Sequence, residues 1–328
     1  MLSFILRRIL LMIPIMIIIS FLIFFIIQLP PGDFLTSLTA RRAAQNEVLD
    51  SAMVLALRER YGLDQPFLVQ YWMWISGIVF RGDFGQSFEW NMPVAGLIWD
   101  RLGMTLVVSV TTLLFVWLVS FPIGIYSAVR QHSLGDMTAT FIAFLGLAIP
   151  NFLMALVLMY VSSRYFGLSV GGLFSPQFAN AAWSPERVWN MISHLWVPVL
   201  VLGSSGAAAL IRVMRANLLD ELNKPYVDIA RSRGVSEARL LFKYPVRVSL
   251  NPFISTVGWV LPALISGEVI TSIVLSLPTA GPLLLNALFA QDMYLAGGII
   301  LLLSIFTLIG TLISDILLAV FDPRIRYT

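Results

Sequence analysis

The sequence predicts an all-α integral membrane protein that crosses the membrane six times, with both termini in the cytoplasm (N-in/C-in). Apolar residues make up 58% of the 328 residues and charged residues 12%, and the mean hydropathy is +0.86. Soluble domains carry about 25% charged residues. Roughly 20 apolar residues in a helix span the hydrocarbon core of a bilayer, and six runs are long enough. These runs are residues 9–27, 102–128, 137–161, 195–216, 253–275 and 294–321.

The first run is expected to remain in the protein as a transmembrane helix that begins on the cytoplasmic side, after Arg7 and Arg8. A cleaved signal peptide is the alternative. Its apolar core would be about 7–15 residues long and would end in small residues. Here the run is longer and ends in Gln28-Leu29-Pro30-Pro31, which favours a retained helix.

Residues 30–100 form a long segment that we expect on the outer side, and we divide the chain into domains at residues 1–100 and 101–328. Residues 41–61 carry apolar side chains at helical spacing, which predicts an amphipathic helix. The part that follows is rich in aromatic residues, and Trp and Tyr favour the membrane–water interface. We expect it to lie across the outer surface. Its aromatic residues are Phe67, Tyr71, Trp72 and Trp74.

The later runs contain prolines, yet each is expected to cross the membrane. Pro122, Pro150, Pro198 and Pro262 lie within or near them. Neighbouring helices can satisfy the backbone groups that such residues leave unpaired. Six crossings place both termini on one side. Close to the membrane ends, Lys and Arg are more frequent on that side, and the positive-inside rule makes it cytoplasmic.

Residues 224–247, between the fourth and fifth runs, are polar and strongly basic, and we call them the basic segment. Each charge at a bilayer centre costs roughly 3 kcal/mol, so the segment is a cytoplasmic loop. A short helix is expected from Tyr226 to Arg233, ended by Gly234, and a second after Ser236. An ordinary positive-inside loop is the alternative. The charged residues are Lys224, Asp228, Arg231, Arg233, Glu237, Arg239, Lys243 and Arg247.

This segment resembles the Glu-Ala-Ala-x-x-x-Gly loop of ABC importer permeases, in the form Asp228-Ile229-Ala230 followed by Gly234. One departure is Ile229, where the motif has Ala. The fuller string Tyr226-Val227-x-x-Ala230-Arg231-x-x-Gly234 is similar to the oligopeptide/dipeptide/nickel branch. Further stretches that resemble this branch lie at residues 61–72, 82–88 and 322–325, so the resemblance covers nearly the whole chain.

The resemblance implies a type I ABC importer transmembrane domain, the permease subunit of a binding-protein-dependent importer for an oligopeptide-like or oligosaccharide-like solute. It implies a bacterial or archaeal plasma membrane protein that contacts lipid. It also implies three kinds of partner: a second, similar permease, two ABC ATPases that bind ATP and Mg, and an extracytoplasmic solute-binding protein. The residues expected to couple to an ATPase are Tyr226, Asp228, Ala230, Arg231, Arg233 and Gly234.

Four residues are candidates on the translocation path or its outer loop: Glu268, Ser272, Pro278 and Gly281. Glu268 is an intramembrane carboxylate, which is costly to bury ionised and is therefore a functional candidate. A satisfied interhelical hydrogen bond or a protonated acid is its alternative. In the family, the loop corresponding to 277–292 contacts the binding protein. Ser272 stands near a position where peptide permeases have a carboxylate, which weakens a strict peptide interpretation.

The sequence carries no motif for ATP chemistry, because a phosphate loop needs Gly-x-x-x-x-Gly-Lys-Ser/Thr and neither Lys224 nor Lys243 follows a glycine. Cysteine is absent, and His132 and His194 lie far apart. We therefore expect no cofactor, metal or catalytic residue in this chain. Basic residues flank apolar runs rather than forming one polar face, which argues against nucleic acid. A secondary transporter, or another polytopic protein without an ATPase partner, is the alternative function.

Overall fold

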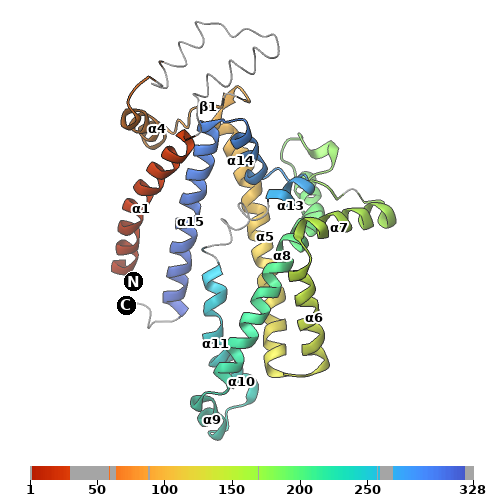
Figure 1. Ribbon diagram of the computed structural model, residues 1–328. Helices are drawn as coiled ribbons and strands as arrows, with labels where there is room; N and C mark the ends of the chain where they lie inside the picture. Colours follow the sequence, from red (N-terminus) through yellow and green to blue (C-terminus); the bar gives the residue numbers. More distant parts are fainter. Residues whose placement is uncertain are drawn as a thin grey trace. The chain divides into compact units, whose positions relative to one another are not determined.

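Figure 1 shows the computed structural model, which describes residues 2–29, 59, 64–87, 89–168, 170–256, 258 and 269–321. These residues are mostly helical and fall into two compact units. The first unit comprises Met1–Leu6, Thr105–Pro278 and Thr307–Thr328, and the second comprises Arg7–Met104 and Thr279–Phe306.

The first unit is built around one long helix, α8, and the helices that pack against it. A core of Val116, Ile125, Leu210, Met214 and Leu218 joins α5 to α8. Helices α6, α7 and α11 also contact α8. The helices are α5 (Val94–Val129, from Thr105 onward), α6 (Leu134–Ala148), α7 (Asn151–Phe166), α8 (Pro185–Leu222), α9 (Pro225–Ser232), α10 (Glu237–Lys243), α11 (Pro245–Ser249), α13 (Val269–Val274), the end of α15 (Met293–Phe321) and the 3-10 turn η1 (Pro176–Phe178).

The run expected to cross the membrane at 137–161 is not one straight helix. Helices α6 and α7 meet at a bend of 102°. Ile149 has extended backbone angles (φ −87°, ψ 121°) ahead of Pro150. A proline disfavours the helical conformation of the residue before it, which is the physical reason for the break. The proline expected to interrupt this run therefore breaks it sharply, and the pair forms either one broken span or a re-entrant loop.

The second unit packs the first helix and the outer segment against the start of α15. Phe24 of α1 and Trp74 of α4 have ring centroids 5.4 Å apart, and both are buried with Leu301. A second core joins Val94 and Ile98 to Leu295 and Ile299. The elements are α1 (Leu2–Gln28), α4 (Phe67–Arg81), the strands β1 (Gln86–Ser87) and β2 (Met92–Pro93), the start of α5, α14 (Ala280–Phe289) and the start of α15.

Strands β1 and β2 pair antiparallel, with Ser87 opposite Met92. The sequence did not predict this hairpin, because two residues are too few to show strand alternation. The described residues are thus mostly, rather than wholly, α-helical. The amphipathic helix expected at 41–61 lies almost entirely outside them, as do residues 257 and 259–268 of the expected crossing at 253–275.

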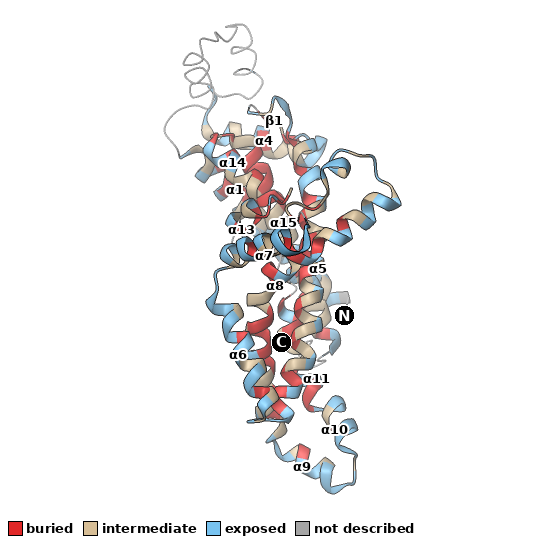
Figure 2. Ribbon diagram, turned by 90° about the vertical axis from the view of Figure 1, so that its right-hand side faces the viewer, coloured by how far each residue is buried: buried red, intermediate tan, exposed pale blue. Residues whose placement is uncertain are grey.

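Four helices of the described residues are long and apolar enough to cross a membrane, and the bent α6–α7 pair would make five. The four are α1, α5, α8 and α15. Their apolar side chains are often exposed, for example Leu10 (64%) on α1 and Leu118 (74%) on α5. Figure 2 shows this exposure along α6 and α7 as well. Exposed apolar surface of this extent marks a contact with lipid or another protein.

Candidate functional site

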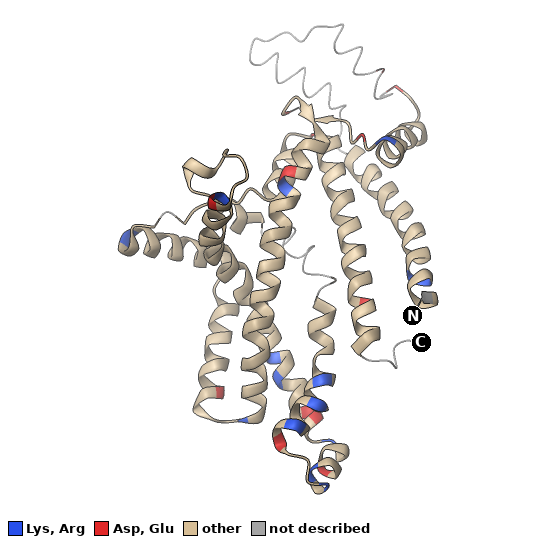
Figure 3. Cartoon of the chain, turned by 180° about the vertical axis from the view of Figure 1, so that it is seen from behind, with Lys and Arg blue, Asp and Glu red and all other residues tan. Residues whose placement is uncertain are grey.

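The basic segment lies beyond the end of α8, where α9, α10 and α11 follow one another as short helices (Figure 1). Figure 3 shows that Lys and Arg residues gather there, whereas most of the length of α5 and α6 is free of them. Pro225 occupies the first turn of α9, a position where its missing N–H is not needed. Asp228 lies in the first turn and Arg231 in the last turn, each favourable for the helix dipole.

Glu221, in the last turn of α8, anchors the segment. It is only 8% exposed. The Tyr226 hydroxyl donates to Glu221 Oε2 at 2.7 Å, and Lys224 Nζ donates to Glu221 Oε1. Burial, together with this hydrogen bond, raises the pKa of Tyr226. Hydrogen bonds to a charged group contribute about 1.5–3 kcal/mol, so α8 and α9 are held together firmly.

The turn between α9 and α10 is closed by Arg231, which bonds to acids on both sides. Its Nε donates to Glu237 Oε1 at 2.7 Å, and Nη1 donates to Asp228 Oδ1 at 3.3 Å. The hydrogen bond from Arg231 lowers the pKa of Glu237. Gly234 has φ +76°, and its N–H donates to the Arg231 carbonyl at 3.0 Å. The helix ends as predicted, because glycine adopts this left-handed conformation without strain.

Buried apolar side chains fix the inner side of the segment. Val227 is fully buried, Leu240 is 1% exposed and Val246 is 2% exposed. Val246 packs into the α5–α8 core, so α11 is held against the rest of the first unit. Arg247 Nη2 donates to the Phe321 carbonyl at 3.3 Å, which links α11 to the end of α15.

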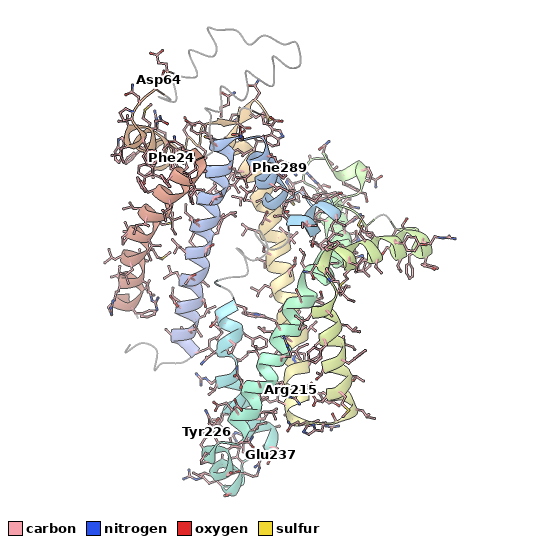
Figure 4. All side chains as sticks on the ribbon, in the orientation of Figure 1. Phe24, Asp64, Arg215, Tyr226, Glu237 and Phe289 are labelled. Carbon is pink, nitrogen blue, oxygen red and sulfur yellow. The ribbon has the colours of Figure 1, made fainter. Side chains whose placement is uncertain are left out.

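The outer side of α9 is exposed and mixed in character. The Asp228 side chain is 73% exposed, and Ile229 is 55% exposed although it is apolar. Arg233 is exposed as well, and Ala230 is half-buried. Figure 4 shows Tyr226 and Glu237 within the segment, with Arg215 further back along α8. The exposed side of α9 is therefore a surface with acidic, basic and apolar side chains.

Of the outer-loop candidates, Ser272 and Pro278 lie in the first unit. Ser272 is 5% exposed within α13, and its carbonyl accepts from Leu277 N at 2.8 Å. Pro278 is half-buried. Glu268 lies outside the described residues.

In the second unit, Gly281 is buried in the first turn of α14. This short helix lies within the loop at 277–292. Asp292 follows it, fully buried, and accepts from Ser87 Oγ at 2.5 Å and from Leu295 N at 3.2 Å. The contact joins the β1–β2 hairpin to the first turn of α15. Ser87 and Asp292 are 205 positions apart in the sequence, so no local sequence pattern predicts their contact.

Residues 120–327 match the family described as "Binding-protein-dependent transport system inner membrane component". The chain belongs to this family. Residues 1–111 match the N-terminal family of the same transport systems. As a member, the chain is the permease subunit of a binding-protein-dependent ABC importer and a multi-pass protein of the bacterial plasma membrane.

Several curated relatives are similar over their whole length. Oligopeptide transport system permease protein AppB of Bacillus subtilis is 36% identical over 327 residues, which cover 99% of each chain. Dipeptide transport system permease protein DppB of Alkalihalophilus pseudofirmus is 29% identical and is covered completely, as is this chain. Glutathione transport system permease protein GsiC of Salmonella typhimurium is 30% identical over 327 residues, again covering both chains.

Sequence reasoning about this permease missed the anchor Glu221, which the segment's motif does not include. Its partners lie three and five residues ahead across a helix boundary, so only the fold shows the contact. It did single out Ile229 as a departure from the motif, but not the exposure of that side chain. In the ranges that the structure describes, no three His, Asp or Glu side chains come together to hold a metal ion.

Proposed function

We propose that partner ATPases drive this permease through the exposed side of α9, which is the docking helix of the basic segment. The observation that carries the proposal is that α9 is anchored on one side and open on the other. Glu221, Val227 and Leu240 hold its inner side. Asp228, Ile229 and Arg233 are exposed. A partner that presses on this surface moves α8 rather than deforming a loose loop.

The assembly follows from the family. This chain and a second, similar permease form the pathway, and two ABC ATPases bind ATP and Mg, so this chain performs no catalysis. Six crossings with both termini in the cytoplasm place the basic segment on the ATPase side. Residues 1–100 are then the first transmembrane helix with an extracytoplasmic segment, and residues 101–328 are the core permease domain with its cytoplasmic coupling loop at 224–247. An extracytoplasmic binding protein delivers solute to residues 30–100 and to the loop at 277–292, which contains Pro278 and Gly281.

The mechanism is a two-state movement biased by nucleotide. Closure of the ATPases on ATP displaces α9, and α8 follows because the two are joined at Glu221. The pathway opens outward and accepts solute from the binding protein. Such coupling requires that nucleotide favour one of two conformations. Tyr226 acts as an anchor in this scheme, Arg231 and Gly234 shape the turn, and Ala230 allows close approach.

The solute we propose is a peptide. The relatives are named for oligopeptides, dipeptides and glutathione, and these names support a peptide over an oligosaccharide. Ser272, in place of a carboxylate, remains a difference from the peptide branch. Mass spectrometry of the ligand carried by the cognate binding protein tests this part. Recovery of an oligosaccharide would rule it out.

The test of the docking role compares Ile229→Asp with Phe242→Asp. Both side chains are apolar and similarly exposed, at 55% and 57%, but Phe242 lies on α10 rather than on α9. A charge that docking buries without a partner is costly to desolvate. We expect the Ile229 variant to insert normally and to lose the ATPases on purification, and the Phe242 variant to retain them. Full retention by the Ile229 variant, or equal loss from both, would refute the docking role.

A further inference from the structure

The contact between α6 and α8 suggests how movement of the basic segment reaches the rest of the first unit. Arg215 lies seven residues before the end of α8, or about 10 Å along the helix axis. It forms a two-bond ion pair with Asp136 in the first turn of α6: Arg215 Nε donates to Oδ1 and Nη2 donates to Oδ2, each at 3.0 Å. The Asp136 side chain is only 4% exposed.

Asp136 also organises the turn that precedes α6. Its Oδ2 accepts from the backbone N–H of His132 at 2.9 Å, and its own N–H donates to Ser133 Oγ at 3.2 Å. His132 has φ +63°, a conformation that this hydrogen bond helps to hold. The turn is therefore tied to α8 through one carboxylate.

Two further contacts join α6 to α8 along their length. The Arg212 guanidinium lies over the Phe144 ring, 5.7 Å from its centroid. A Cβ added to Gly146 would lie 3.3 Å from the Ser204 carbonyl oxygen, so the two backbones are close there. The ion pair at Asp136 and the close backbone approach at Gly146 lie at opposite ends of α6. The helix is fixed to α8 from its start to the bend that leads to α7.

We propose that Asp136 and Arg215 are positioning residues for transport, a clamp that makes α6 and the α6–α7 bend follow α8 when the basic segment moves. This inference rests on the proposed docking role of the basic segment. Glu221 transmits displacement from α9 to α8, and the clamp transmits it from α8 to α6. When the Asp136–Arg215 ion pair is lost, the ATPases still hydrolyse ATP, but α6 no longer moves with α8.

The experiment measures solute taken up per ATP hydrolysed in proteoliposomes that hold the complete importer. Arg215→Lys keeps the cation but loses the planar fork that makes two bonds to one carboxylate. We expect uptake per ATP to fall at least about fivefold, the lower end of typical coupling effects, while the ATPases stay bound. Arg212→Lys is the matched control one turn away: lysine keeps a cation that can lie over the Phe144 ring, so this variant should keep the wild-type ratio.

A second variant covers the case in which Arg215→Lys assembles poorly. The chain has no cysteine, so Asp136→Cys combined with Arg215→Cys introduces one defined pair. A short, reducible bis-methanethiosulfonate reagent then bridges the two thiols, with the same treatment of the cysteine-free chain as control. Bridging should restore the uptake-to-ATP ratio, and reduction should remove it again. A role in folding alone predicts no such reversible change.

The inference is overturned if Arg215→Lys keeps the wild-type ratio, or if the bridged cysteine pair transports no better than the reduced pair. Failure of the proposed docking role has a different signature, because Ile229→Asp would then retain the ATPases. The two outcomes are read from different variants and different measurements.

Discussion

Replacing Gly234 perturbs the turn after α9 without touching any neighbour. Gly234 has φ +76°, and a Cβ built at this position meets no atom within 4 Å. An added Cβ therefore acts through the backbone conformation and not through a clash within this chain. Asparagine tolerates this conformation, alanine does so less well, and a β-branched valine is a clear outlier. Replacing Gly234 by Asn, Ala and Val therefore gives backbone strain that increases in this order.

The strain from valine is about 1–3 kcal/mol, the usual cost of a non-glycine residue held in a left-handed conformation. Since 1.4 kcal/mol is a factor of ten in an equilibrium constant, the population of the native turn relative to alternative turns falls about five- to 150-fold. The hydrogen bond between Tyr226 and Glu221 lies at the start of α9, whereas Gly234 follows its end, so the substitution does not affect this bond directly. We expect α9 to remain formed but to be presented to the ATPase in altered orientations.

The assay is uptake per ATP hydrolysed in proteoliposomes, with membrane insertion checked separately. Coupling should fall in the order Asn, Ala, Val, with insertion unchanged. Gly167 is the matched control: it ends α7 with φ +64°, and its added Cβ also meets nothing within 4 Å. Gly167→Val should cost similar strain without uncoupling. Normal uptake in Gly234→Val, or equal uncoupling in both valine variants, would refute the reasoning.

Two further predictions concern buried carboxylates. Tyr226→Phe removes the hydroxyl that donates to Glu221, which should cost about 1.5–3 kcal/mol and speed hydrogen exchange in α9. Because the folded-state pKa of Tyr226 is raised above its ordinary 10.0, its contribution is complete below pH 10 and is lost as pH rises through the folded value. A difference absorbance titration against Tyr226→Phe should therefore show less than half of Tyr226 ionised at pH 10, and ionisation of half or more would contradict this. Asp292→Ala removes a helix cap worth about 1 kcal/mol and leaves the buried Ser87 hydroxyl without this acceptor. Hydrogen exchange in the β1–β2 hairpin should therefore rise, and unchanged hydrogen exchange would count against the contact.

The sequence alone predicts the helices whose causes are local. Long apolar runs gave α1, α5, α8 and α15, and the glycine at position 234 gave the end of α9. Proline shows the limit of such reasoning. Pro14, Pro122 and Pro198 lie inside continuous helices, whereas Pro150 stands at a 102° bend. A proline can therefore break a helix, as Pro150 does, but its presence in the sequence does not tell which helix is broken.

The candidate site divides in the same way. The motif identified α9 and its exposed acidic and basic residues, because their order along the chain carries the resemblance. It could not identify Glu221 or the Asp136–Arg215 pair, which join residues across helix boundaries or 79 positions apart. These contacts depend on how α6, α8 and α9 pack. A single sequence contains no periodicity that reports such packing.

The account depends on the claim that partner ATPases drive the permease through the exposed side of α9. A single cysteine at Ile229, in a chain with no other, places a thiol-reactive photo-cross-linker at the centre of that surface. In membranes that hold the complete importer, the account predicts that this probe captures an ATPase subunit and that the thiol reacts with impermeant reagents only from the cytoplasmic side. Capture of no ATPase at this position, or labelling from the outside, would contradict the claim.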